Sequence, residues 1–124
     1  MLTDQAREIL ADRTIIHVAG VDTDGRPHNS AVWADVDPEG RIVFNTAEGR
    51  IKDRYLRVGA PVCISATRIG NDYEAITVRG TVVERTTEGA DAMIDALAKK
   101  YLDADSYPLR REGEVRVTIR VEVP

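Results

Sequence analysis

Positively charged side chains gather in one short run of the sequence, NTAEGRIKDRYLR at residues 45–57. The run holds two acidic side chains and four basic ones, Arg50, Lys52, Arg54 and Arg57, in a chain whose net charge is −4. The amide of Asn45, the hydroxyl of Thr46 and the cations of Arg50 and Lys52 precede or open a predicted helix, an arrangement that suits a phosphate or carboxylate ligand. An exposed basic helix face with solvated acidic partners would explain the same composition.

Motifs for other kinds of chemistry are missing from the sequence. It contains no G-x-G-x-x-G dinucleotide fingerprint, no G-x-x-x-x-G-K-[ST] phosphate loop and no G-x-S-x-G nucleophile elbow. The two histidines do not form an H-E-x-x-H motif, and one cysteine cannot build a cysteine-based zinc cluster. A hydrolase with an activated nucleophile is therefore poorly supported, and an enzymatic reaction would depend on a cofactor.

Five individual residues are each candidates for a functional or a structural role. His28 begins a predicted strand and is either a proton donor or a solvent-exposed strand end. His17 lies within a predicted strand, as a core or interface residue. Trp33, the only tryptophan, either packs in the core or flanks a planar ligand, because its indole N–H needs a partner. Phe44 is expected in the core, and Cys63 is expected to be an inert, buried thiol.

Length and composition indicate one domain, residues 1–124, with an ordinary globular content of 43% hydrophobic residues. The negative net charge argues against nucleic acid and anionic membranes as partners. A single cysteine excludes an intrachain disulfide and favours a cytoplasmic location. Acidic residues at positions 4, 8 and 12 argue against a signal peptide, and no apolar run approaches the roughly 20 residues of a membrane helix.

Periodicity predicts six strands and three helices. Alternating or β-branched runs separated by Gly, Pro, Asn and Asp predict strands over residues 14–22, 28–37, 41–46, 62–69, 73–85 and 115–123. Helical spacing predicts helices near residues 3–12, within 47–61 and over 90–101. Tight turns imply antiparallel neighbours, and six such strands avoid open edges by closing into a small barrel with helices at its ends. Gly80 is expected to mark a bulge or bend, and the last strand is expected to be buried on one face only.

The ordered set of motifs resembles the pyridoxamine phosphate oxidase-like split-barrel family, in particular its coenzyme F-420 (deazaflavin) dependent oxidoreductases. The resemblance rests on G-R-P at a hairpin, V-W in the next strand, a strand ending in Asn45-Thr46, Arg50-Ile51-Lys52 opening a helix, and Pro61 before the following strand. The resemblance covers residues 12–85 well, whereas in the remainder only the order of the predicted helices and strands agrees. Tyr55 stands where relatives commonly carry Asn, and the second strand lacks the basic residues of true pyridoxamine phosphate oxidases.

The resemblance implies a mostly β, six-stranded antiparallel split barrel that forms a homodimer with the cofactor at the interface. In this sequence the implied cofactor-binding residues are His28, Ser30, Val32, Asn45, Thr46, Arg50, Ile51, Lys52 and, from the partner chain, Tyr73. The leading hypothesis is a reductase that transfers a hydride from reduced F-420 to an electron-poor small molecule of the quinone, enone or tetrapyrrole type. The alternatives are an FMN-dependent oxidase or reductase and a non-catalytic flavin- or haem-binding protein. Arg110 and Arg111 could contribute to the substrate pocket through an irregular loop.

Overall fold

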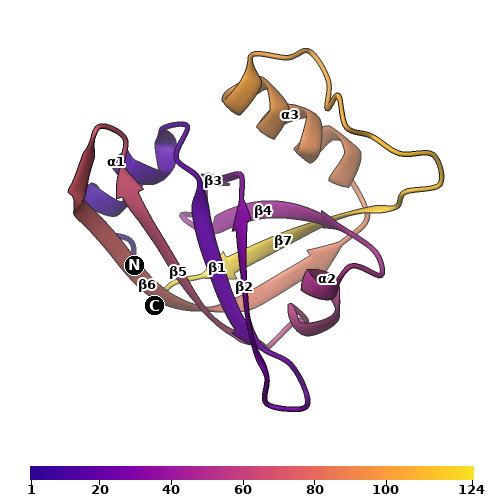
Figure 1. Cartoon of the computed structure of the whole chain (residues 1–124), viewed down its shortest axis with the longest axis horizontal. Helices are drawn as coiled ribbons and strands as arrows, with labels where there is room; N and C mark the ends of the chain where they lie inside the picture. Colours follow the sequence, from indigo (N-terminus) through magenta and orange to yellow (C-terminus); the bar gives the residue numbers. More distant parts are fainter.

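A computed structural model describes all residues, 1–124, as one curled antiparallel sheet with three helices around it (Figure 1). The strands are β1 (Ile16–Val21), β2 (Pro27–Val32), β3 (Ala34–Val36), β4 (Ile42–Ala47), β5 (Pro61–Arg68), β6 (Asn71–Thr86) and β7 (Arg116–Glu122). The helices are α1 (Asp4–Ala11), α2 (Ile51–Tyr55) and α3 (Ala90–Leu102). The fold class is therefore the mostly β, barrel-like one that the sequence predicts.

The sheet has seven strands rather than the predicted six, because the strand expected over residues 28–37 is divided at Trp33. Its first half, β2, pairs with β1, whereas its second half, β3, pairs with β4. The strand order is β2-β1-β5-β6-β7-β4-β3, so the two halves lie at opposite edges of the sheet. One residue of chain thus joins the two edges and draws the sheet into a barrel, which places Trp33 at the seam.

The turns and the first helix form as local sequence predicts. Gly25 and Gly40 both adopt positive φ in the hairpin turns, where a residue without Cβ is favoured. The Thr3 hydroxyl accepts a hydrogen bond from the Ala6 amide at 3.1 Å and caps α1. Helix α2 is shorter than the stretch considered for it, since its regular part ends at Tyr55.

The hydrophobic core fills the inside of the curled sheet. Phe44 is fully buried there as expected, together with Ile and Val side chains of β1, β4, β5 and β7. Helix α1 adds Ile9 and Leu10, and the end of α2 adds Tyr55 and Leu56. Gly20 leaves room for the Tyr55 ring, because a Cβ at Gly20 would lie 2.6 Å from Tyr55 Cε2.

Helix α3 covers the outer face of β4 and β7, so the expectation that the last strand is buried on one face only is wrong. Strand β7 was expected to be buried on one face, but Arg116 and Thr118 of its polar face are also buried.

Gly80 is not itself the bulge: its Cα faces β7, where a Cβ would meet the Glu122 carbonyl oxygen at 2.6 Å. The register shift in β6 falls between Val82 and Glu84. None of the three helices is long and apolar enough to cross a membrane.

Candidate functional site

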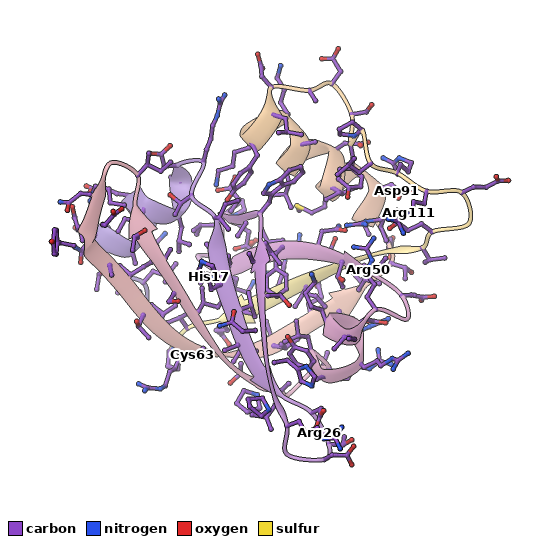
Figure 2. The ribbon with its side chains drawn as sticks, in the orientation of Figure 1. His17, Arg26, Arg50, Cys63, Asp91 and Arg111 are labelled. Carbon is purple, nitrogen blue, oxygen red and sulfur yellow. The ribbon has the colours of Figure 1, made fainter.

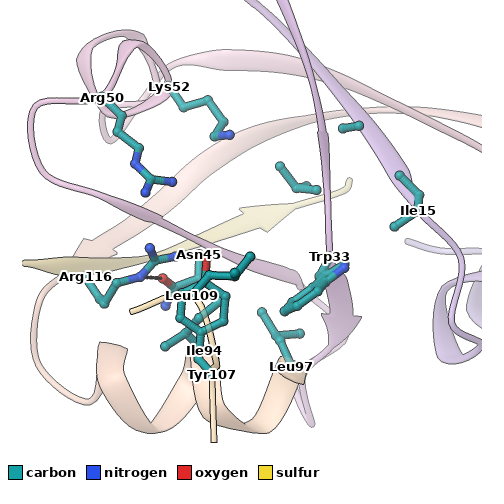
Figure 3. A pocket seen from close by; sticks show the side chains of 12 residues that line it. Ile15, Trp33, Asn45, Arg50, Lys52, Ile94, Leu97, Tyr107, Leu109 and Arg116 are labelled. Atoms are coloured by element: carbon teal, nitrogen blue, oxygen red, sulfur yellow. Dashed lines mark hydrogen bonds between the residues drawn. The ribbon is translucent and has the colours of Figure 1, made fainter. Parts of the chain in front are cut away.

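An open pocket of about 370 Å³ lies between the barrel seam, the start of α2 and the inner face of α3 (Figure 3). It is lined by Ile15, Ala31, Val32, Trp33, Asn45, Arg50, Lys52, Ile94, Leu97, Tyr107, Leu109 and Arg116. Four of the residues implicated from sequence, Val32, Asn45, Arg50 and Lys52, therefore meet in one place. They come from β2, β4 and the beginning of α2, which adjoin each other only because the sheet is curled.

The pocket has a cationic end built from three side chains of two separate segments. Arg50 precedes α2, Lys52 lies in its first turn, and Arg116 begins β7. In Figure 3, Arg50 and Lys52 lie on the α2 side of the pocket and Arg116 on the β7 side. The three formal positive charges make this end suited to an anionic group.

Lys52 is the cation of the three that has no partner within the chain. Its ammonium is half-buried and makes neither a side-chain hydrogen bond nor an ion pair. Burial lowers the pKa of Lys52, and the nearby Arg50 and Arg116 guanidinium groups lower it further. An anion beside Lys52 would relieve both effects, so the ammonium is available to a ligand.

Asn45 holds Arg116 and α3 in position and has little hydrogen-bonding capacity left for a ligand. Its amide nitrogen donates to the Ala90 carbonyl oxygen at 2.9 Å, and its amide oxygen accepts from Arg116 Nε at 2.8 Å. The Arg116 guanidinium also lies over the Tyr107 ring, 5.1 Å from its centroid. Asn45 thus lines the pocket as expected, mainly as a support for Arg116.

The other end of the pocket is apolar and aromatic. The Trp33 ring stacks on Tyr101 with centroids 5.4 Å apart and meets the edge of Tyr107 at 6.0 Å. Ile94 and Leu97 of α3 are buried beside it, and Leu109 is exposed at the rim. Of the two readings of Trp33, the structure supports the pocket wall. Such a surface accepts a flat, apolar ring system.

Thr46, Ile51 and Tyr73 do not line the pocket. The Thr46 side chain is fully buried and its hydroxyl has no hydrogen-bond partner. Along β4 it alternates with Asn45, which places it on the opposite face of the strand. Ile51 is 61% exposed beside Lys52, and Tyr73 is fully exposed at the start of β6. A contribution of Tyr73 to a partner chain stays a prediction.

His28 and Ser30 share the face of β2 that carries Val32, but they lie outside the pocket lining. His28 Nε2 is 2.8 Å from Asp22 Oδ2, and the His28 ring stacks on Tyr55 with centroids 4.9 Å apart. The hydrogen bond with His28 is the main cause that lowers the pKa of Asp22. His28 is thus partnered within the chain rather than simply solvent-exposed.

His17 and Cys63 lie on the β1 and β5 part of the sheet (Figure 2), away from the cationic end. His17 is exposed rather than buried, and Cys63 is half-exposed. His17 is therefore not a core residue, and its place in an interface stays a prediction, whereas the expectation of a buried Cys63 is wrong for the isolated chain, because neither α1 nor α3 covers this outer face. No group of His, Cys, Asp and Glu side chains could hold a metal ion.

Arg116 and most of the apolar wall were not predicted from the sequence. Alternation along β7 placed Arg116 on a solvent face, and only the packing of α3 turns that face into part of a pocket. Arg110, noted from sequence as a possible contributor, instead forms ion pairs with Asp91 and Asp95 of α3. The loop side chains that reach the pocket are Tyr107 and Leu109.

The fold and site together define a small split barrel with a pocket that joins an aromatic wall to an anion-attracting end. The sequence profile of pyridoxamine 5'-phosphate oxidase matches residues 3–123. The chain belongs to this family. No curated protein is similar enough in sequence to match it.

Solved structures with the same fold include an F420 reductase, at 25% sequence identity and a TM-score of 0.85. That alignment covers 99% of this chain and 96% of the other. A conserved hypothetical protein from Mycobacterium tuberculosis has 18% identity and a TM-score of 0.72, over 99% of this chain and 81% of that one. An FAD and haem binding protein from Mycobacterium smegmatis has 15% identity and a TM-score of 0.66, over 100% and 68%.

Proposed function

We propose that this chain is a coenzyme F-420 (deazaflavin) dependent reductase that passes a hydride to an electron-poor small molecule of the quinone, enone or tetrapyrrole type. The observation that carries the proposal is the pairing, in one pocket, of an aromatic wall at Trp33 with an unpartnered Lys52 close to Arg50 and Arg116. The similarity to an F420 reductase along nearly the whole of both chains supports the choice of cofactor.

The residues present fit a cofactor that has a flat ring and an anionic side chain. Lys52, Arg50 and Arg116 would hold the anionic part, while Trp33 and Leu97 would contact the ring. When bound, the deazaflavin supplies the hydride from its C5 to the acceptor. The side chains of α3 and the loop after it exclude water from one side of the pocket and orient what binds there.

We further propose a homodimer in which a second copy covers the rim of the pocket. Ile15, just before β1, and Ala31 of β2 line the pocket and are also exposed, next to the outer face of β1 where His17 and Val21 lie. The pocket is therefore continuous with an uncovered sheet face. A second copy on this face would bury its apolar side chains and would enclose the ligand. A solution mass close to one chain at micromolar concentration would contradict the dimer.

Competitive titration with F-420 and FMN tests the choice of cofactor. The basic residues exceed what one phosphate needs, so we expect F-420, with its oligoglutamate tail, to bind at least tenfold more tightly, or about 1.4 kcal/mol. Removal of the tail or addition of salt should reduce this preference, because exposed ion pairs are screened.

Tighter binding of FMN, or yellow protein directly after purification, would instead favour an FMN-dependent oxidase or reductase. A Soret band would favour a haem-binding protein. The pocket lining contains no histidine that could serve as an axial ligand within one chain, since His17 and His28 both lie outside it.

A further inference from the structure

Glu114 places a carboxylate between two of the three cations of the pocket. It lies in the loop before β7, with Oε1 accepting hydrogen bonds from Arg50 Nη2 at 2.7 Å and Arg116 Nη1 at 3.0 Å. Its other oxygen, Oε2, accepts from the Arg111 backbone amide at 3.3 Å. The Glu114 side chain is only 7% exposed, so this carboxylate is built into the site rather than attached to its surface.

The two arginines depend on Glu114 to different degrees. Arg116 is 3% exposed at its side chain and is also held by Asn45 and by the Tyr107 ring. Arg50 is 42% exposed at its side chain, and Glu114 is its only ion-pair partner. Arg50 can therefore exchange this carboxylate for another anion without breaking any other side-chain hydrogen bond or ion pair.

Glu114 is ionised at neutral pH. Burial by itself raises the pKa of Glu114, but the Arg111 amide and the Arg116 and Arg50 guanidinium groups outweigh burial, and the net pKa is lowered. The cationic end therefore has three positive charges and one negative charge. The negative charge occupies guanidinium N–H groups that an incoming anion would use.

We propose that Glu114 is an internal competitor for the anionic group of the ligand and yields Arg50 when that group binds beside Lys52. Glu114 thereby lowers the affinity of the pocket for anions in general and limits tight binding to ligands with enough negative charge to displace it. The inference rests on the proposed cofactor pocket, because the same cations are assigned to the cofactor there.

The substitution Glu114→Gln distinguishes a carboxylate that competes with the ligand from one that only positions Arg50 and Arg116. Glutamine keeps an oxygen that can accept from Arg50 and Arg116 but removes the negative charge. If Glu114 competes, the net charge of this end rises from +2 to +3 and anions bind more tightly. If Glu114 only positions the arginines, the affinity stays unchanged or falls.

The experiment is a calorimetric titration of the full-length chain with inorganic pyrophosphate, which requires no catalysis. We expect Glu114→Gln to bind pyrophosphate about five- to tenfold more tightly than the wild-type chain, with a steeper loss of affinity as salt is added. The matched control is Glu112→Gln, which makes the same charge change in the same loop at an exposed residue without an ion pair or hydrogen bond. It should change the affinity by less than about twofold.

Unchanged or weaker binding by Glu114→Gln, or an equal gain in Glu112→Gln, would overturn the proposal. If Glu114→Gln does not fold by circular dichroism, Glu114→Ala is measured by the same criterion. A parallel titration with F-420 keeps the two proposals apart. If Glu114→Gln binds pyrophosphate more tightly but the protein does not bind F-420, the proposed reductase function is wrong and the role of Glu114 stands. If the protein binds F-420 but Glu114→Gln gains no affinity for pyrophosphate, only the proposed role of Glu114 is wrong.

Discussion

Replacement of Lys52 by alanine should weaken binding of the cofactor far more than it affects the fold. A hydrogen bond to a charged group contributes about 1.5–3 kcal/mol, so we expect an affinity loss of roughly ten- to 150-fold. The free energy of unfolding should change by less than about 1 kcal/mol, because the Lys52 ammonium makes no ion pair or hydrogen bond within the chain. Trp33 fluorescence can follow the titration, and thermal unfolding can follow stability.

Two matched variants make this prediction specific. Arg54→Ala removes a charge from the same helix at an exposed residue outside the pocket lining, and it should leave binding nearly unchanged. Lys52→Arg keeps the positive charge and should retain most of the affinity. Equal losses in Lys52→Ala and Arg54→Ala would refute the reasoning, because they would indicate a diffuse basic face instead of a site.

The pH dependence of binding gives an independent check on Lys52. The pKa of this group in the free protein is lowered from 10.5, mainly by burial, and a bound anion would raise it again. Affinity should therefore fall as the pH rises through the lowered pKa, before 10.5 is reached, and Lys52→Arg should remove this fall. In the free protein the charged form of Lys52 costs stability; this cost is present at neutral pH, falls once the pH rises through the lowered pKa and is gone above 10.5.

Further predictions concern the packing and ion pairs that support the site and the occupation of the pocket. Gly20→Ala should destabilise the fold by about 1–3 kcal/mol, because the new Cβ would lie 2.6 Å from the Tyr55 ring; an unchanged melting temperature would contradict this packing. Asp53→Ala should cost about 2–3 kcal/mol in urea unfolding, because it removes the nearer carboxylate of Arg85, at 2.7 Å, and leaves only Glu48 at 3.9 Å. Burial raises the pKa of Asp53, but the hydrogen bonds from Arg85 and the Gly49 amide, together with the Arg85 and Arg57 charges, outweigh burial and lower it. The stability from these contacts is therefore present above pH 3.8 and should be lost as the pH falls through the lowered pKa. Trp33 fluorescence should change when a ligand fills the pocket, and an unchanged spectrum at saturation would show that the ligand binds elsewhere.

Local sequence was sufficient for the elements and for part of the site. Turn residues such as Gly25, the Thr3 cap and the alternation along β7 are encoded within a few neighbouring residues, so the strand runs and α1 follow from them. The basic run also predicted the cations Arg50 and Lys52 beside Asn45. Composition could not distinguish a binding site from an exposed basic face, because both contain the same residues.

Only the tertiary structure decided which faces meet. Trp33 divides one predicted strand because its two halves pair with different strands and lie at opposite edges of the sheet, and such long-range pairing leaves no local signal. Arg116 belongs to the pocket because α3 covers the second face of β7, and Glu114 is buried between Arg50 and Arg116, which come from separate segments of the chain. Alternation along a strand determines which side chains share a face, whereas the segment that covers that face is set by how the whole chain packs.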